Sequence, residues 1–153
     1  MTSEPGVPVP GTSRETAPTR LVLLDEPFER KDLTALRQAV AAHGDRTGLP
    51  PERVADLVLI ASELASNAVR HGGGHGRLRL WTTDTTASCQ VTDDGPGMPA
   101  TYQLPQQSPD LATAGGRGLW LVLYFSDTIT VEHADGSGVS VTATMNLPSP
   151  DTI

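Results

Sequence analysis

The longest amphipathic pattern in the 153-residue chain covers residues 52–71 and has the 3.6-residue period of an α-helix. Its apolar stripe consists of Val54, Leu57, Val58, Ala61, Leu64, Ala65 and Ala68. Glu63 and Asn67 are four residues apart, so both fall on one face, roughly opposite this stripe. A carboxylate can accept a proton and an amide oxygen can bind Mg²⁺, but the pair alone also fits an ordinary solvated helix face.

Shorter patterns predict the other elements of an α+β domain. The expected strands cover residues 21–24, 77–81, 88–92, 128–132 and 139–147. The expected helices cover residues 30–43, 52–71 and 118–125. The first strand is placed at a sheet edge because Pro27 follows it, and Pro51 suits the first turn of the long helix. The apolar run 118–125 is ambiguous by period alone, but the glycines on both sides of Arg117 favour a helix.

Three segments are predicted to lack regular structure. Residues 1–18 are rich in proline and glycine and read as a disordered leader, and residues 149–153 read as a tail. Between them, residues 19–148 form one domain. Residues 100–116 are polar and without period, and so long a connection in a compact domain usually moves or binds something.

Composition narrows the classes of function. The hydrophobic fraction of 37% and charged fraction of 19% fit a globular protein. The formal charge of −7 and the single lysine, Lys31, argue against nucleic-acid binding, which needs clustered cations. No apolar run is long enough to span a membrane, and the single cysteine, Cys89, fits a reducing cytoplasm. We therefore expect a cytoplasmic protein that binds neither membrane nor nucleic acid.

Two glycine-containing segments add chemistry to that of the long helix. Asp93 follows a predicted strand and precedes Gly95 and Gly97. A carboxylate there can accept a hydrogen bond from the adenine amine, and the glycines let a base approach the backbone. Gly116 and Gly118 open the next helix, whose free amides and positive dipole end suit phosphates. Together with the helix pair, these segments predict a site for a nucleotide.

In this order, the three segments resemble the GHKL nucleotide-binding fold of histidine kinases, gyrase, Hsp90 and MutL. Residues 63–72 look like its N box, residues 93–97 like its G1 box and residues 116–119 like its G2 box. The sequences of these three segments are most similar to those of the short bacterial RsbW-type anti-sigma-factor serine/threonine-protein kinases. The resemblance covers residues 19–147. It implies an α+β two-layer sandwich with a mixed, mostly antiparallel sheet and three helices on one face.

The resemblance also implies roles for individual residues. Carried over by position, Glu63 is the general base, Asn67 the Mg²⁺ ligand and Asp93 the adenine reader. The remaining residues expected around the nucleotide are Gly95, Gly97, Met98, Gly116, Arg117, Gly118 and Leu119. Residues 98–115 are the expected ATP lid. Of the two arginines near these segments, Arg117 is expected at a phosphate, while Arg70 is not assigned such a role.

One position departs from the family pattern. Many relatives have Gly-Thr at the start of the last strand, where the threonine helps to bind adenine through water, whereas here Val139 follows Gly138. Ser140 and Thr142 are the candidates to replace that threonine.

Three functions are open at this point. The first is an ATP- and Mg²⁺-dependent serine/threonine-protein kinase that binds a sigma factor and phosphorylates an anti-sigma factor antagonist of STAS type, with Glu63 deprotonating the acceptor hydroxyl. The second is a module in which ATP occupancy sets partner affinity with little or no phosphoryl transfer. The third is a detached histidine-kinase catalytic domain. A homodimer is one assembly state to test.

Overall fold

A computed structural model describes residues 19–71, 73–93, 117–133 and 138–149, with backbone only for residues 117–119. The predicted leader, the whole predicted lid and the last four residues of the tail lie outside these ranges. None of the described helices is long and apolar enough to cross a membrane.

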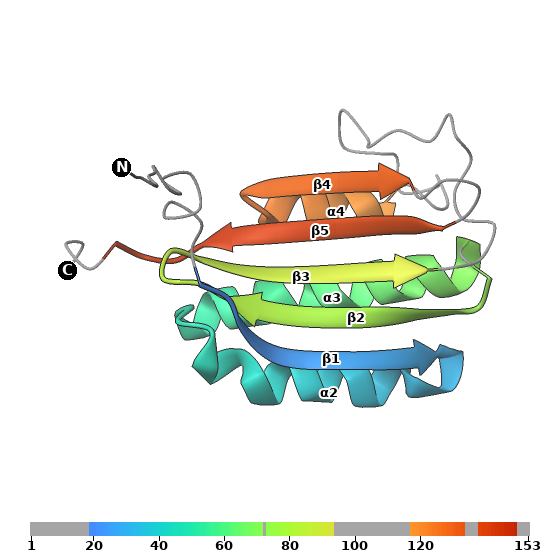
Figure 1. Ribbon diagram of the computed structural model, residues 1–153, viewed down its shortest axis with the longest axis horizontal. Coiled ribbons are helices and arrows are strands. Elements are labelled where there is room, and N and C mark those ends of the chain that lie inside the picture. The colour runs from blue at the N-terminus through green and yellow to red at the C-terminus, as the bar shows by residue number, and fades with distance from the viewer. Residues whose placement is uncertain (1–18, 72, 94–116, 134–137, 150–153) are drawn as a thin grey trace, which may run out of the picture.

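A five-stranded sheet with the order β1-β2-β3-β5-β4 forms one layer of the molecule (Figure 1). Its strands are β1 (Leu21–Glu29), β2 (His75–Thr82), β3 (Thr86–Asp93), β4 (Thr128–His133) and β5 (Val139–Asn146). Both predicted hairpins are present, as β2–β3 and β4–β5. All four pairs of neighbouring strands are antiparallel, so the described sheet has none of the parallel pairing that a mixed sheet would contain.

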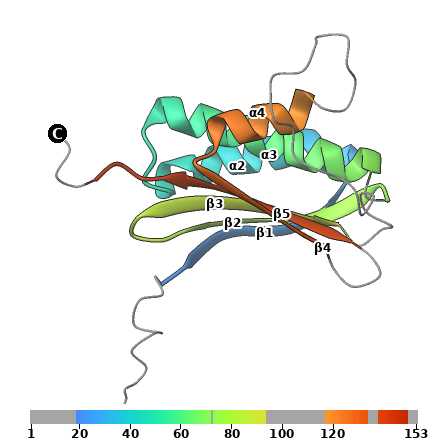
Figure 2. The same cartoon turned by 90° about the horizontal axis from the view of Figure 1, so that it is seen from above.

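Three α-helices cover one face of this sheet, and no helix of the described residues lies on the other, which we call the helix-free face (Figure 2). They are α2 (Leu33–His43), α3 (Pro51–His71) and α4 (Arg117–Phe125), accompanied by the 3₁₀ turns η1 (Arg30–Asp32) and η2 (Gly44–Arg46). All three helices were predicted, and α3 begins at Pro51, whose missing N–H is harmless in a first turn. The predicted two-layer α+β architecture is confirmed.

The hydrophobic core lies between the two layers and follows the period of two along each strand. On β5, Val139, Val141, Ala143 and Met145 face the helices and are buried, while the residues between them are more exposed. Leu78 and Leu80 of β2 are fully buried on the same side. Burial also raises the pKa of the Cys89 thiol on β3 to about 12, because the apolar core cannot solvate a thiolate.

Strand β1 is longer than predicted because it continues through Pro27 to Glu29. It pairs only with β2 and therefore lies at the sheet edge, as expected. At an edge, a proline can be accommodated because its missing N–H need not be part of the hydrogen-bonded ladder. The register shifts between Val22 and Leu24, where a bulge adds a residue to β1.

An ion-pair network fixes α4 against the start of α3. Arg53 of α3 donates from Nη1 to Asp56 at 2.7 Å and from Nη2 to the Phe125 carbonyl at 3.1 Å. Its Nη2 also lies 3.7 Å from Asp127, which accepts a 2.7 Å hydrogen bond from the Asn146 amide of β5. The last turn of α4 is thereby tied to α3 and to the sheet.

Candidate functional site

The three segments singled out in the sequence come together at one end of the molecule. The C-terminal half of α3, the end of β3 and the start of α4 all lie at the same edge, on the right in Figure 1, and Figure 2 shows the same grouping for the helices. Helix α3 packs against α4 and against β3. The fold therefore places Glu63 and Asn67, Asp93, and the α4 N-terminus around one region.

Asn67 is buried, with only 4% of its surface exposed, whereas Glu63 is half-buried. The prediction that both side chains lie on a polar face opposite the core was therefore wrong for Asn67. The sheet covers one side of α3, while α2 and α4 pack against others, so its buried arc is wider than the apolar stripe. Ile60 and Val69, which the stripe did not include, are buried for the same reason.

Asn67 has one satisfied and one unsatisfied polar atom. Its Oδ1 accepts a long hydrogen bond, 3.4 Å, from Nη2 of Arg70, one turn further along α3. Its Nδ2 is buried and has no hydrogen-bond partner among the described residues. An unsatisfied buried amide is costly, and such groups mark positions where something else completes the hydrogen bonding. The i,i+3 spacing of Asn67 and Arg70 could have indicated their contact, but sequence reasoning did not assign it.

Asp93 occupies a position that the core pattern would give to an apolar residue. It is the last residue of β3 and follows Cys89 and Val91 on the side that faces the helices. Its side chain is 4% exposed, as deeply buried as that of Asn67. At this strand end, where α3 and α4 meet the sheet, Asp93 supplies a buried hydrogen-bond acceptor.

Comparison with known proteins assigns this arrangement to a family. The model of the histidine kinase-like ATPase domain matches residues 27–145. The chain belongs to this family.

Two solved structures of histidine kinases are similar to the chain. The NMR structure of the histidine kinase domain of the E. coli osmosensor EnvZ is 14% identical, with a TM-score of 0.48, over 87% of this chain and 94% of that chain. The Acinetobacter baumannii histidine kinase AdeS is 19% identical, with a TM-score of 0.47, over 84% of this chain and 70% of that chain. No curated protein matches the sequence.

The departure at Val139 has a structural consequence within the histidine kinase-like ATPase fold. Val139 is the cross-strand partner of Asp93, and it is 3% exposed on the helix-facing side. Ser140 and Thr142 cannot replace a threonine there, because both point to the opposite side of the sheet. They bond to Thr92 at 3.1 Å and to Gln90 at 2.9 Å, respectively. Neither hydroxyl therefore lies on the side of Asp93, where adenine binding is predicted.

The other predicted site residues are only partly described. Gly95, Gly97, Met98 and Gly116 lie outside the described residues, as does the whole expected lid. Arg117, Gly118 and Leu119 form the first turn of α4, whose N–H groups have no partner within the helix. A role at a phosphate stays a prediction for this first turn of α4.

The available ligands suit a metal that is brought in by a nucleotide. Within the described ranges, no three His, Cys, Asp or Glu side chains gather into a metal site. Mg²⁺ in nucleotide sites commonly uses one or two protein oxygens and completes its shell with phosphates and water. Asn67 can supply one such oxygen, Oδ1, whose hydrogen bond from Arg70 is long at 3.4 Å.

Proposed function

We propose that the chain is an ATP-dependent serine/threonine-protein kinase of the anti-sigma-factor type. In this proposal it binds a sigma factor and phosphorylates a STAS-type antagonist of the anti-sigma factor. Membership of the histidine kinase-like ATPase family supports the ATP-dependent part. The amino-acid sequence of residues 63–72, which includes Glu63 and Asn67, supports the serine/threonine-kinase part.

One observation carries the proposal. Glu63 and Asn67 lie one helical turn apart on α3, at the edge where buried Asp93 ends β3 and where α4 begins. Within one region, a half-buried carboxylate, an amide, a buried acceptor and a helix N-terminus could serve proton transfer, metal binding, base recognition and phosphate binding, respectively.

Each residue has a distinct part in the proposed reaction. Asp93 accepts the hydrogen bond of the adenine amine, and the first-turn amides of α4 bind phosphate oxygens. Asn67 Oδ1 holds Mg²⁺, which when bound neutralises charge on the β- and γ-phosphates. Glu63 takes the proton of the acceptor hydroxyl as that oxygen attacks the γ-phosphorus and ADP leaves. Asn67 must turn away from Arg70 to present Oδ1 to a divalent cation, because the guanidinium would repel it.

The direct test is a phosphorylation assay. The protein is incubated with Mg-ATP and candidate antagonist proteins, and phosphoserine or phosphothreonine is measured by mass spectrometry. Transfer to a hydroxyl that disappears in Glu63→Ala supports the proposal. ATP binding without transfer would support an ATP-gated binding module, and acid-labile phosphohistidine on a partner would support a histidine-kinase domain.

The metal role is tested separately by calorimetric titration of Asn67→Ala. Without its amide oxygen, Mg-ATP should bind more weakly, whereas ATP with excess EDTA should lose little affinity. Ser66→Ala, on the preceding residue of α3, is the matched control and should change neither titration. An equal loss with and without Mg²⁺ in Asn67→Ala would contradict a role in metal binding.

A further inference from the structure

The helix-free face of the sheet divides into two halves with different polar chemistry. On β3 and β5, side chains bond to one another across the strands: Ser88 to Thr144 at 2.9 Å, Gln90 to Thr142 at 2.9 Å and Thr92 to Ser140 at 3.1 Å. These hydroxyl and amide groups satisfy one another. This half of the face does not need a ligand to complete its hydrogen bonds.

The half formed by β1 and β2 carries cations instead. Arg77 and Arg79 alternate with buried residues along β2, and Arg20 directly precedes β1. In the part of the chain that the structure describes, the ion pairs of Arg77 and Arg79 both go to Asp25, with Nε–Oδ distances of 2.6 Å and 3.7 Å. The Asp25 carboxylate is thus shared between two guanidinium groups. The surface is locally cationic in a chain whose formal charge is −7.

Arg79 is the less satisfied of the two. Its Nε is buried and has no hydrogen-bond partner among the described residues, because 3.7 Å to Asp25 is too long for a hydrogen bond. A buried donor on a charged group is costly when unsatisfied, so an acceptor supplied from outside would be favoured. A carboxylate suits it best, since the planar guanidinium fork binds two carboxylate oxygens at once.

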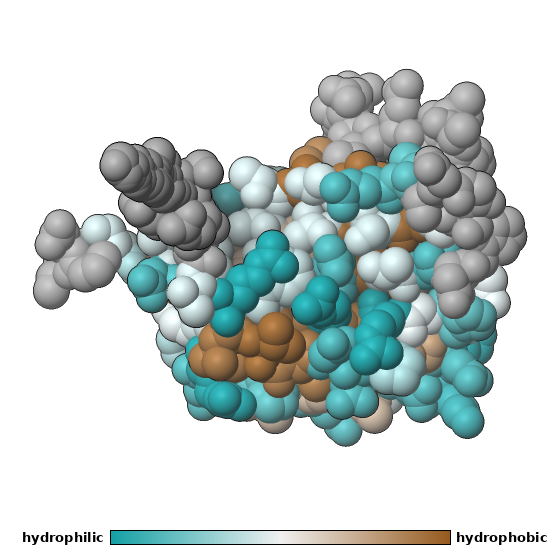
Figure 3. Space-filling model, in the orientation of Figure 1, coloured by the Kyte–Doolittle hydropathy of each residue, from teal (hydrophilic) through white to brown (hydrophobic). Residues whose placement is uncertain are grey.

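Trp81 holds two of these arginines in place. The Arg20 and Arg79 guanidiniums lie 4.6 Å and 5.8 Å from the centre of its ring, which is itself only 5% exposed. Its cross-strand partner Val22 is 44% exposed, and Leu21 beside it is 54% exposed. Figure 3 shows an apolar patch at the start of β1 bordered by hydrophilic side chains. Arginine and tryptophan are enriched at protein interfaces and among the residues that contribute most to binding.

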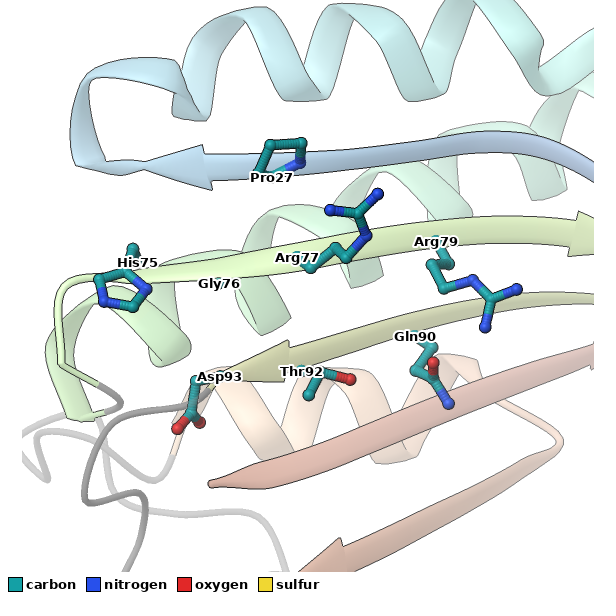
Figure 4. A pocket seen from close by; sticks show the side chains of 8 residues that line it. All are labelled: Pro27, His75, Gly76, Arg77, Arg79, Gln90, Thr92 and Asp93. Atoms are coloured by element: carbon teal, nitrogen blue, oxygen red, sulfur yellow. The ribbon is translucent and has the colours of Figure 1, made fainter. Parts of the chain in front are cut away.

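A cavity of about 430 Å³ lies on the same face beside the arginines. Figure 4 shows Arg77 reaching toward β1 and Arg79 toward β3, with Gln90 and Thr92 next to them. Asp93 and His75 lie at the far end, toward the edge of the candidate nucleotide site. The room beside Arg79 is sufficient for an acidic side chain of another molecule.

We propose that the helix-free face of β1 and β2 is a docking surface for an acidic, extended segment of a partner protein. Carboxylates of that segment bind Arg79, Arg77 and Arg20, and an apolar side chain next to them packs on Val22. The commitment to an acidic partner rests on charge complementarity, because this surface concentrates three of the eleven Lys and Arg residues of an acidic chain. The surface lies across the sheet from the helices, so the proposal does not depend on the proposed kinase activity.

Fluorescence anisotropy with a fluorescein-labelled peptide that alternates glutamate and leucine tests the surface. The full chain should bind this peptide, and it should bind the matched glutamine–leucine peptide at least about tenfold more weakly. The double variant Arg77→Gln/Arg79→Gln should lose about tenfold or more in affinity for the glutamate peptide, because charge-assisted hydrogen bonds are lost. Arg20→Gln, outside the strand ladder, should also weaken binding and guards against misfolding of the double variant. Arg46→Gln, an exposed arginine of η2, is the control and should bind like the parent.

Several outcomes would overturn the proposal. One is that the parent binds the glutamate and the glutamine peptide with equal affinity. Another is that both arginine variants bind the glutamate peptide as tightly as the parent does. A third is that the parent binds neither peptide measurably. Sedimentation velocity supplies a further outcome. A parent protein that dimerises while the double variant stays monomeric would assign the surface to a second copy of the chain and not to an acidic partner.

Discussion

The two faces of the sheet follow the same alternation but tolerate polar groups on different terms. On the helix-free face, hydroxyls and amides pair with one another or remain in contact with solvent. On the helix-facing side, the inward positions of β5 are all apolar, and the inward positions of β3 are apolar up to Val91. Asp93 then breaks the pattern at the strand end, opposite Val139.

This difference shows where the protein buries polar groups at a cost in stability. A paired hydroxyl or amide on the β3–β5 half of the helix-free face can exchange its protein partner for water, so its presence says little about function. A buried carboxylate at Asp93 and a buried amide at Asn67 have no such exchange, and both occur at the edge where the candidate nucleotide site lies. Exceptions to the core pattern therefore identify the site more clearly than the polar residues that follow it.

The largest effect is expected from Glu63→Ala, which changes chemistry on the helix side without changing the core. Phosphoryl transfer or ATP hydrolysis should fall by about 10²–10⁴, the usual contribution of a positioned general base. Nucleotide affinity should stay near the parental value or rise, since a negative charge near the triphosphate is removed. Coupled turnover assays and calorimetry measure the two quantities.

Glu52→Ala is the control, because Glu52 is exposed in the first turn of the same helix. If Glu63→Ala turned over ATP at the parental rate, Glu63 would not be the general base.

Leu80→Ala should destabilise the protein more than a substitution on the helix-free face does. Leu80 is fully buried between the sheet and the helices, so its truncation should lower the free energy of unfolding by about 2–5 kcal/mol. Urea denaturation followed by circular dichroism measures the change. A loss below that of a substitution on the helix-free face would show that the core does not lie where the structure puts it.

Cys89 provides a pH-dependent measure of the same core. Its folded pKa of about 12 lies above the usual thiol pKa of 9.0, so its contribution to stability is fully present below pH 9 and is lost as the pH rises toward 12. In that window the contribution of Cys89 should fall by about 1.4 kcal/mol per pH unit. Urea denaturation at several pH values, compared with Cys89→Ala, isolates it. Identical slopes in the two proteins would mean that the thiol is not desolvated.

Asp93→Asn tests whether the buried carboxylate at the end of β3 binds adenine. An amide is both donor and acceptor, so the variant should bind ATP about 10- to 100-fold more weakly, both with Mg²⁺ and without it. Calorimetric titration measures the loss, with Asp84→Asn in the exposed β2–β3 turn as the control. Undiminished affinity in Asp93→Asn would remove adenine recognition from this residue.

The smallest effect is expected on the helix-free face. Thr142→Ala removes the acceptor of Gln90, and solvent can replace it, so unfolding should become easier by only about 0.5–1.5 kcal/mol. The same denaturation experiment used for Leu80→Ala provides the measurement. A loss as large as that of Leu80→Ala would remove the contrast between the faces.

The sequence by itself determined the two-layer architecture and the family of the domain. Periodicity located the helices and strands, since 3.6-residue and 2-residue repeats reflect which side chains must be buried together. The order of Glu63, Asn67 and Asp93, with glycines after them, indicated the histidine kinase-like ATPase family that the family model supports. Local signals such as Pro51 at a helix start were sufficient for several boundaries.

Only the tertiary structure decided which side chains are buried and which face each other. The apolar stripe of α3 gave no sign that Asn67 is covered, because its burial depends on contacts of α3 with the sheet and the other helices, elements far apart in sequence. Strand register decided that Val139 faces Asp93 while Ser140 and Thr142 point away, since a shift of one residue reverses every side chain of a strand. The arginine surface on β1 and β2 likewise requires strand pairing, which brings Asp25 and Arg77 together across 52 positions of sequence.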